Sequence, residues 1–237
     1  MATFLKAEWR KLTIVNYVID PEILLPYLPY KTELDFYDNK CFLSLVGFMF
    51  LNTRVLGVKI PYHINFEEVN LRFYVKHKDQ SGIMKRGVVF IKEIVPKKAI
   101  TYIANKFFKE NYETMLMKHE WNESKERIKA AYFWGRFRWN SIWIESPRNP
   151  YQIKPGSEEE FITEHYWGYA RADTQKTIEY EVEHPAWELY PVTHCYVDVS
   201  FDRIYGNQFA FLRKTDFHSA YLAEGSPISV MSGQTIK

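Results

Sequence analysis

Two adjacent lysines are the first residues in this chain whose types and spacing suggest covalent chemistry. Lys97 and Lys98 follow Glu93 and Pro96, where a predicted strand gives way to a predicted helix. One ammonium group beside another in an apolar pocket loses its proton more easily, and the neutral amine can then form a Schiff base with a ketone. The alternative is that both lysines are exposed at the start of a helix, as surface lysines usually are.

An arginine on a strand with two chemically different faces is the second candidate. Residues 67–78 alternate, so that Arg72 shares a face with polar residues while an apolar set points the other way. An arginine inside a protein needs a carboxylate partner or an anionic ligand. Glu164 and Tyr166 would share a face of a later strand, next to His165, and could meet it. Such a cluster would bind a small carboxylate or carbonyl compound; the alternative is a solvated strand face or a structural ion pair.

Other kinds of site have no signal in the sequence. The seven histidines include no pair four residues apart, and no C-x-x-C motif occurs, so we expect no metal site. The chain has neither a G-x-S-x-G nucleophile motif nor a glycine-rich phosphate loop, and we expect no cofactor. Ser226, which follows Gly225, is interpreted as a turn residue.

Composition excludes several classes of partner. The formal net charge is +2 and no dense block of Lys and Arg occurs, so we expect a small-molecule ligand and no nucleic acid. The longest apolar run, Cys41 to Leu51, is too short to span a bilayer, and the first residues lack the apolar core of a signal peptide. Two cysteines suit a reducing compartment, which predicts a cytoplasmic location. Homo-oligomerisation is left open.

The elements that must position these residues are mainly strands. The 17 Tyr, 17 Phe and 7 Trp favour half-buried strand surfaces, and large rings of this kind fill a barrel or line a pocket. No linker or repeat divides residues 1–237, which are therefore expected to form one domain. Strands recur at short spacing with few helices, which predicts a mostly β fold built as a barrel or strongly curved sheet.

Local signals predict where the helices and one hairpin lie. Helices are expected from Asp20 to about Leu28, over residues 97–111, and after the capping residue Ser157. A hairpin is expected between Glu33–Tyr37 and Lys40–Leu51, around the turn residues Asp38 and Asn39.

Several stretches together resemble the YqjF-like family of uncharacterised conserved proteins. They include Trp9-x-x-Leu12, the run from Phe66 to Val75, the run from Phe161 to Tyr169, His184-Pro185-x-Trp187 and Ala223-Glu224-Gly225-Ser226. Their order and spacing agree nearly end to end. That family resembles a branch of the acetoacetate decarboxylase-like superfamily. The resemblance implies a β-rich α+β fold: a cone-shaped antiparallel β-barrel with a central cavity and a few short helices.

The resemblance also implies roles for individual residues. In decarboxylases of that fold, a lysine pair after a Glu and a Pro forms the Schiff base, which corresponds to Lys97 after Glu93 and Pro96. The spacing from Glu to Pro is about two residues shorter here. The glutamate and arginine beside the decarboxylase cavity correspond to positions near Arg54 and Ala7, which implies a scaffold whose chemistry has been changed or lost.

Three hypotheses follow. The first is a small-molecule enzyme or enzyme-like protein in which arginine side chains bind the anionic group, Glu164 neutralises or orients it, and His165 or Tyr166 moves a proton. Its ligand-binding residues would be Arg54, Arg72, Tyr74 and Tyr166. The second is a non-catalytic ligand-binding protein with the same cavity. The third is a Schiff-base decarboxylase that uses Lys97.

Overall fold

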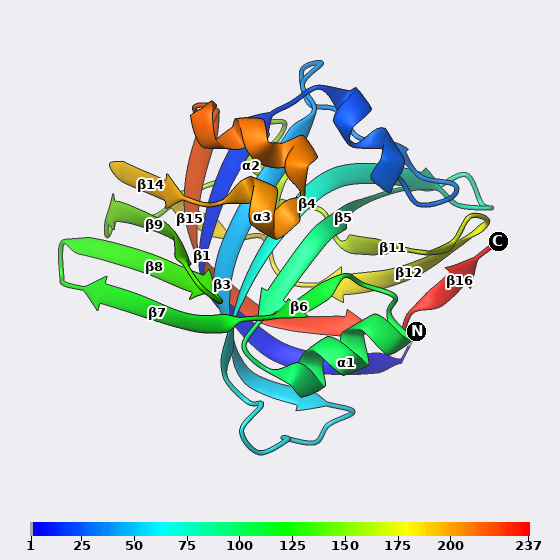
Figure 1. Cartoon of the computed structure of the whole chain (residues 1–237), viewed down its shortest axis with the longest axis horizontal. Helices are drawn as coiled ribbons and strands as arrows, with labels where there is room; N and C mark the ends of the chain where they lie inside the picture. Colours follow the sequence, from blue (N-terminus) through cyan, green and yellow to red (C-terminus); the bar gives the residue numbers. More distant parts are fainter. Residues whose placement is uncertain (1) are drawn as a thin grey trace.

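The computed structural model describes residues 2–237, which fold mainly as two β-sheets (Figure 1). The larger sheet contains β1 (Thr3–Val18), β2 (Glu33–Leu34), β3 (Phe42–Val55), β4 (Phe66–Lys78), β5 (Met84–Val95), β6 (Tyr112–Thr114), β10 (Tyr151–Gln152), β11 (Trp167–Asp173), β12 (Lys176–Glu183), β13 (Glu188–Tyr190), β15 (Ser219–Met231) and β16 (Gln234–Ile236). The smaller sheet contains β7 (Leu116–Glu123), β8 (Arg127–Gly135), β9 (Trp139–Pro147) and β14 (His194–Asp198). The α-helices are α1 (Lys98–Phe107), α2 (Glu158–Thr163) and α3 (Phe201–Tyr205), and 3-10 helices cover Pro21–Ile23, Leu25–Tyr27 and Asn207–Lys214.

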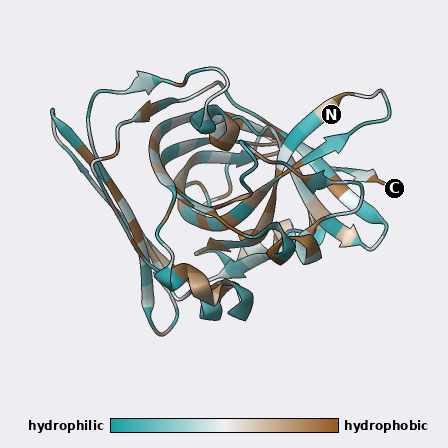
Figure 2. Cartoon of the chain, turned by 90° about the horizontal axis from the view of Figure 1, so that it is seen from above, coloured by the Kyte–Doolittle hydropathy of each residue, from teal (hydrophilic) through white to brown (hydrophobic). Residues whose placement is uncertain are grey.

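The larger sheet closes into a ring. Its strands pair in the order β15-β1-β3-β4-β5-β11-β12, and β12 returns to β15 through the pairs Val182–Val230 and Glu183–Ser229. Seen from above, these strands curve around a common centre, with bands of opposite hydropathy along them (Figure 2). The predicted mostly β, acetoacetate decarboxylase-like architecture is confirmed.

One detail of the pairing differs from the expected antiparallel arrangement. β5 pairs in parallel with both β6 and β11. After β5 the chain leaves the ring, builds three strands of the smaller sheet and α2, and returns beside β5 in the same direction. A parallel pair needs a long crossover of this kind, whereas a short hairpin can join only antiparallel strands.

The two faces of β4 pack in opposite directions. Its apolar face points out of the ring and is fully buried, in the same apolar core as Tyr132 and Trp134 of β8 in the smaller sheet. This face consists of Val69, Leu71, Phe73 and Val75. Its polar face points into the ring. The alternation predicted from sequence is therefore correct, and both faces are covered.

The predicted hairpin is wrong, although its turn is real. Asp38 and Asn39 have left-handed backbones, with φ of 48° and 58°, and a bridge between Tyr37 and Lys40 closes the turn. The strand before the turn, however, is only β2, which pairs with β4. β3 begins opposite the middle of β4, so the last residues of β4 have a free edge that β2 occupies.

Two predicted helix starts are confirmed with their caps. The Asp20 side chain accepts a hydrogen bond from the Glu22 amide at the start of the first 3-10 helix, and Ser157 accepts one from the Glu160 amide at the start of α2. The helix expected over residues 97–111 is the shorter α1. Within residues 2–237, no helix is both long enough and apolar enough to cross a membrane.

Candidate ligand cavity

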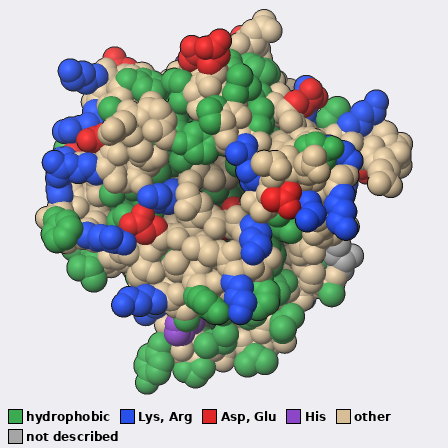
Figure 3. Space-filling view, turned by 45° about the vertical axis from the view of Figure 1, so that its right-hand side comes forward, with side chains coloured by type: hydrophobic (Ala, Val, Ile, Leu, Met, Phe, Trp, Pro, Cys, Tyr) green, Lys and Arg blue, Asp and Glu red, His purple; other side chains and the backbone are tan. Residues whose placement is uncertain are grey.

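The ring encloses a cavity of about 270 Å³. One wall is aromatic. Trp9 of β1 lies 5.2 Å from Phe48 of β3, measured between ring centroids, and Phe50 stacks on Phe66 at 4.7 Å. The apolar face of α1 and the segment between β3 and β4 contribute further lining residues. The space-filling view shows a hollow in the surface with Lys and Arg side chains around it (Figure 3).

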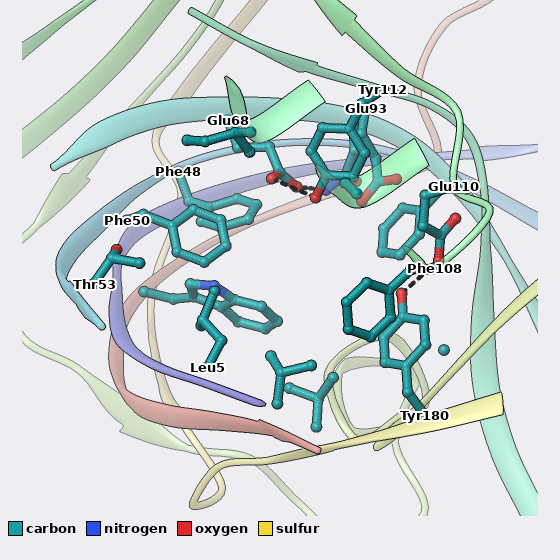
Figure 4. A pocket seen from close by; sticks show the side chains of 18 of the residues that line it. Leu5, Phe48, Phe50, Thr53, Glu68, Glu93, Phe108, Glu110, Tyr112 and Tyr180 are labelled. Atoms are coloured by element: carbon teal, nitrogen blue, oxygen red, sulfur yellow. Dashed lines mark hydrogen bonds between the residues drawn. The ribbon is translucent and has the colours of Figure 1, made fainter. Parts of the chain in front are cut away.

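Carboxyl groups from three segments gather at the opposite wall (Figure 4). Glu68 accepts hydrogen bonds from the Asn70 amide at 3.0 Å and from the Tyr112 hydroxyl at 3.1 Å. Glu110 accepts one from the Tyr180 hydroxyl at 2.6 Å. Glu93 lies close to both acids, and its Oε2 has no hydrogen-bond partner among the described residues.

The backbone explains why these three acids meet. Arg72 of β4 pairs with Phe90 of β5, whereas Leu71 pairs with Lys92, so Ile91 is an extra residue that forms a bulge. The bulge shifts the alternation of β5 and turns Glu93 to the same side as Phe90. Beyond α1 the backbone turns back at residue 109, whose φ is 59°, and brings Glu110 to the cavity.

Burial makes this cluster a set of weak acids. It raises the pKa of Glu68 and of Glu110 from 4.5 to about 7, against the hydrogen bonds that lower both values. Burial and the charges of Glu110 and Glu68 raise the pKa of Glu93 well above its usual range. Near neutral pH, Glu93 is therefore a protonated donor, whereas the other two acids lie near the midpoint of their titration.

Unsatisfied polar atoms are concentrated in the cavity wall. Eleven buried side-chain polar atoms have no hydrogen-bond partner among the described residues, and six of them belong to residues that line this cavity. The six are Trp9 Nε1, Thr53 Oγ1, Asn70 Oδ1, Arg72 Nε, Glu93 Oε2 and His165 Nδ1. A buried polar atom without a partner costs about 1–3 kcal/mol, so a polar occupant that pairs with these atoms would be stabilised by the cavity.

Two residues predicted from sequence, Arg72 and His165, line the cavity. Arg72 is half-buried and donates from its NH2 group to the Ile162 carbonyl oxygen at 3.3 Å. The expected ion pair between Arg72 and Glu164 is not among the ion pairs of residues 2–237, because Glu164 caps the end of α2 and binds the Tyr166 hydroxyl instead. The strand that was expected to begin at Glu164 begins only at Trp167.

The other predicted site residues lie elsewhere. Arg54 is exposed, because its neighbour Thr53 faces the cavity and adjacent strand residues face opposite ways. Tyr74 is buried behind the lining, where its hydroxyl bonds to Ser44 at 2.7 Å. Lys97 is half-buried at the start of α1, and Lys98 is exposed. No lysine is among the described residues that line the cavity.

Sequence reasoning missed the most acidic part of the site. Glu68 shares the Arg72 face of β4, so the alternation already contained its signal. Glu93 was singled out only as part of the lysine motif. Nothing local indicated Glu110 or Tyr180, because their hydrogen bond joins residues 70 positions apart. Within residues 2–237, no group of three His, Cys, Asp or Glu side chains is arranged to hold a metal ion.

Comparison with known proteins identifies the family of this chain and the structures that share its fold. The family model described as an uncharacterized conserved protein, DUF2071, matches residues 6–227. The chain belongs to this family. The uncharacterized protein YqjF of Bacillus subtilis is 25% identical over 232 residues, covering 94% of this chain and 85% of YqjF.

Solved structures share the fold at low identity. Acetoacetate decarboxylase from Legionella pneumophila has a TM-score of 0.65 at 11% identity, covering 100% of this chain and 88% of the other. An acetoacetate decarboxylase-like enzyme from Sphingomonas wittichii has a TM-score of 0.66 at 10% identity, covering 100% and 94%. The enduracididine biosynthesis enzyme MppR, complexed with pyruvate, has a TM-score of 0.69 at 9% identity, covering 100% and 91%. These likenesses establish the fold.

Proposed function

We propose that the protein binds a small carbonyl compound in the ring cavity and catalyses proton transfer at the carbon next to the carbonyl group. The observation that carries this proposal is the cluster of Glu68, Glu93 and Glu110, whose surroundings set their pKa values apart. Where neighbouring acids are separated in this way, the group with the higher pKa serves as the acid and an ionised neighbour as the base.

The reaction needs only groups that face the cavity. The ionised carboxylate of Glu68 or Glu110 removes a proton from the carbon next to the carbonyl, so a C–H bond breaks and its electron pair forms a C=C bond. The carbonyl π pair moves to oxygen, which takes the proton from Glu93. The product is an enol and the reverse steps regenerate the ketone. The aromatic wall holds the apolar body of the ligand and excludes water.

A carboxylate on the same ligand is favoured by a separate observation. Arg72 lines the cavity and its Nε has no partner among residues 2–237, so it can donate a charge-assisted hydrogen bond to an anionic oxygen. MppR, which shares the fold, has been solved with pyruvate, a compound with a carbonyl beside a carboxylate. We therefore extend the proposal to oxo acids as ligands.

Deuterium exchange tests the proposal with a probe ketone, so the natural substrate need not be known. The neutral ketone 4-phenylbutan-2-one is incubated with the protein in D₂O, and loss of the proton signals next to the carbonyl is followed by NMR. General acid–base groups typically contribute about 10²–10⁴-fold to a rate, so Glu93→Gln should slow the exchange by about 100-fold or more. The oxo acid 2-oxo-4-phenylbutanoate adds a carboxylate to the ketone. If Arg72 binds that carboxylate, the oxo acid should bind more tightly than the ketone.

The matched control is Glu126→Gln. Glu126 is exposed between β7 and β8 of the smaller sheet, so its replacement should leave the exchange rate unchanged. Binding of the ketone is followed separately by tryptophan fluorescence, since Trp9, Trp167 and Trp187 line the cavity. Binding without exchange would support the non-catalytic alternative. The proposal would be refuted if the protein neither binds these compounds nor catalyses their exchange.

A further inference from the structure

A histidine at the cavity wall is held by a carboxylate outside it. His165 lines the cavity and its side chain is only 1% exposed. Its Nε2 lies 3.4 Å from Oδ2 of Asp35, a residue that does not line the cavity. Its other nitrogen, Nδ1, is buried and has no hydrogen-bond partner within residues 2–237. We propose that Asp35 is a positioning residue, which holds His165 in the tautomer that presents a bare Nδ1 to a hydroxyl or enol group of the cavity ligand.

The fold fixes Asp35 from behind. β2 pairs with the end of β4, and the Asp35 amide continues this pairing by donating to the Tyr74 carbonyl oxygen at 3.0 Å. Arg86 of β5 lies beside the same part of β4 and donates from Nε to Asp35 Oδ2 at 2.6 Å. The guanidinium group of Arg86 also lies 4.8 Å from the Phe161 ring centroid. The Arg86 contact and the backbone pairing hold the Asp35 carboxylate with Oδ2 beside His165.

The imidazole ring is also constrained on its faces. The His165 ring centroid lies 4.8 Å from that of Tyr74 and 5.0 Å from that of Phe161. The ring is therefore packed on the aromatic residues behind the cavity wall. Rotation that would exchange its two nitrogens would have to displace these neighbours.

The charge state of the pair determines the tautomer. The hydrogen bonds from His165 and Arg86 outweigh burial and lower the pKa of Asp35, so it is ionised and can only accept. Burial, together with the positive charges of Arg86 and Arg72, lowers the pKa of His165 to about 4 in spite of Asp35. A neutral imidazole next to a carboxylate carries its proton on the nitrogen that faces the carboxylate, which here is Nε2. Nδ1 is then an acceptor.

An unprotonated Nδ1 gives the cavity wall a hydrogen-bond acceptor in addition to the donor that Glu93 supplies. Glu93 is a protonated donor, whereas His165 is an acceptor, and a ligand hydroxyl or enol supplies the donor that Nδ1 lacks. The inference goes beyond the proposed proton transfer, because it concerns how the cavity orients a hydroxyl-bearing ligand and holds whether or not that ligand is turned over.

Nitrogen NMR of the histidine rings tests the inference. In protein labelled with ¹⁵N-histidine, the signals of His165 are assigned from their loss in His165→Asn. The wild type should show a protonated Nε2 and an unprotonated Nδ1. Asp35→Asn presents an amide that can donate to Nε2 and should move the proton to Nδ1 or mix the tautomers. Asp216→Asn, at an exposed position, should leave the spectrum unchanged.

The ligand-directed part is tested with the alcohol 4-phenylbutan-2-ol, whose hydroxyl donates. Its addition should shift the Nδ1 signal of the wild type towards lower frequency, as acceptance of a hydrogen bond does, with a smaller shift in Asp35→Asn. A protonated Nδ1 in the wild type would overturn the inference even if Asp35→Asn does not fold. An Nδ1 signal that the saturating alcohol leaves unmoved would also overturn it. Neither result depends on the deuterium exchange, so the two proposals can fail separately.

Discussion

Replacing one buried carboxyl of the cavity with its neutral analogue should stabilise the protein at alkaline pH and leave it unchanged in acid. Glu68 is 3% exposed, and burial raises its pKa from 4.5 to about 7. Between these two values the folded protein keeps a proton that the unfolded chain has lost. The free energy of unfolding therefore falls as the pH rises through this window. Glu68→Gln removes this titrating group, so the variant does not lose this part of its unfolding free energy as the pH rises.

The magnitude follows from the size of the shift. A rise of the Glu68 pKa from 4.5 to about 7 lowers the free energy of unfolding by about 3 kcal/mol once the pH is above the folded pKa. The glutamine can keep both neighbours, because its oxygen still accepts from the Asn70 amide and its NH2 group donates to the Tyr112 hydroxyl oxygen once that hydroxyl has turned. No large packing loss should offset the gain.

Urea denaturation at about pH 4 and about pH 8 measures the effect as the difference in unfolding free energy between variant and wild type. The expected difference is near zero at the lower pH and about 3 kcal/mol in favour of Glu68→Gln at the higher pH. Glu126→Gln, at an exposed position, should follow the wild type at both. A variant that is less stable than the wild type by the same amount at both pH values would refute the reasoning, because Glu68 would then contribute hydrogen bonds rather than a titration.

Two further predictions concern the cavity wall and the lysine motif. At Gly168 of β11 an added Cβ would lie 2.1 Å from Cζ of Tyr180, so Gly168→Ala should destabilise the protein by about 1–3 kcal/mol, measured by denaturation, and weaken ketone binding by displacing the partner of Glu110. If the variant is as stable as the wild type and binds the ketone equally well, the Tyr180 ring moves aside without cost and the prediction is wrong. Borohydride reduction in the presence of pyruvate should add no mass to the peptide that contains Lys97, because that residue is not among those that line the cavity. A mass increment on that peptide by intact and peptide mass spectrometry would restore the Schiff-base hypothesis.

Much of the local structure could be predicted because it depends on neighbours in the chain. The caps at Asp20 and Ser157 form where side-chain oxygens meet the free amides of the next turn. The two faces of β4 follow from alternation, which is a property of extended backbone. The turn at Asp38 also formed as predicted, but its strands did not pair with each other, because β4 offered a free edge that no local pattern reveals.

The candidate site depended on the tertiary structure. Alternation states which residues of β4 share a face, but only the closed ring makes the polar face the inner one, whereas polar faces of sheets more often meet solvent. The bulge at Ile91 reverses the facing of Glu93, and a single extra residue of this kind cannot be located from the alternation alone. Lys97 lies at the predicted junction between β5 and α1, but only the tertiary structure shows that it is not among the described residues that line the cavity.

The sequence by itself therefore determined a β-rich chain, its helix caps, the two-faced character of β4 and, through resemblance, the fold. The tertiary structure decided which side of the strands faces the cavity and which distant residues meet there. Glu68, Glu93 and Glu110 come from two strands and the turn after a helix, and His165 meets Asp35 across 130 positions. Contacts of this kind are set by strand register and ring closure, which depend on the packing of the whole chain and not on any local run of residues.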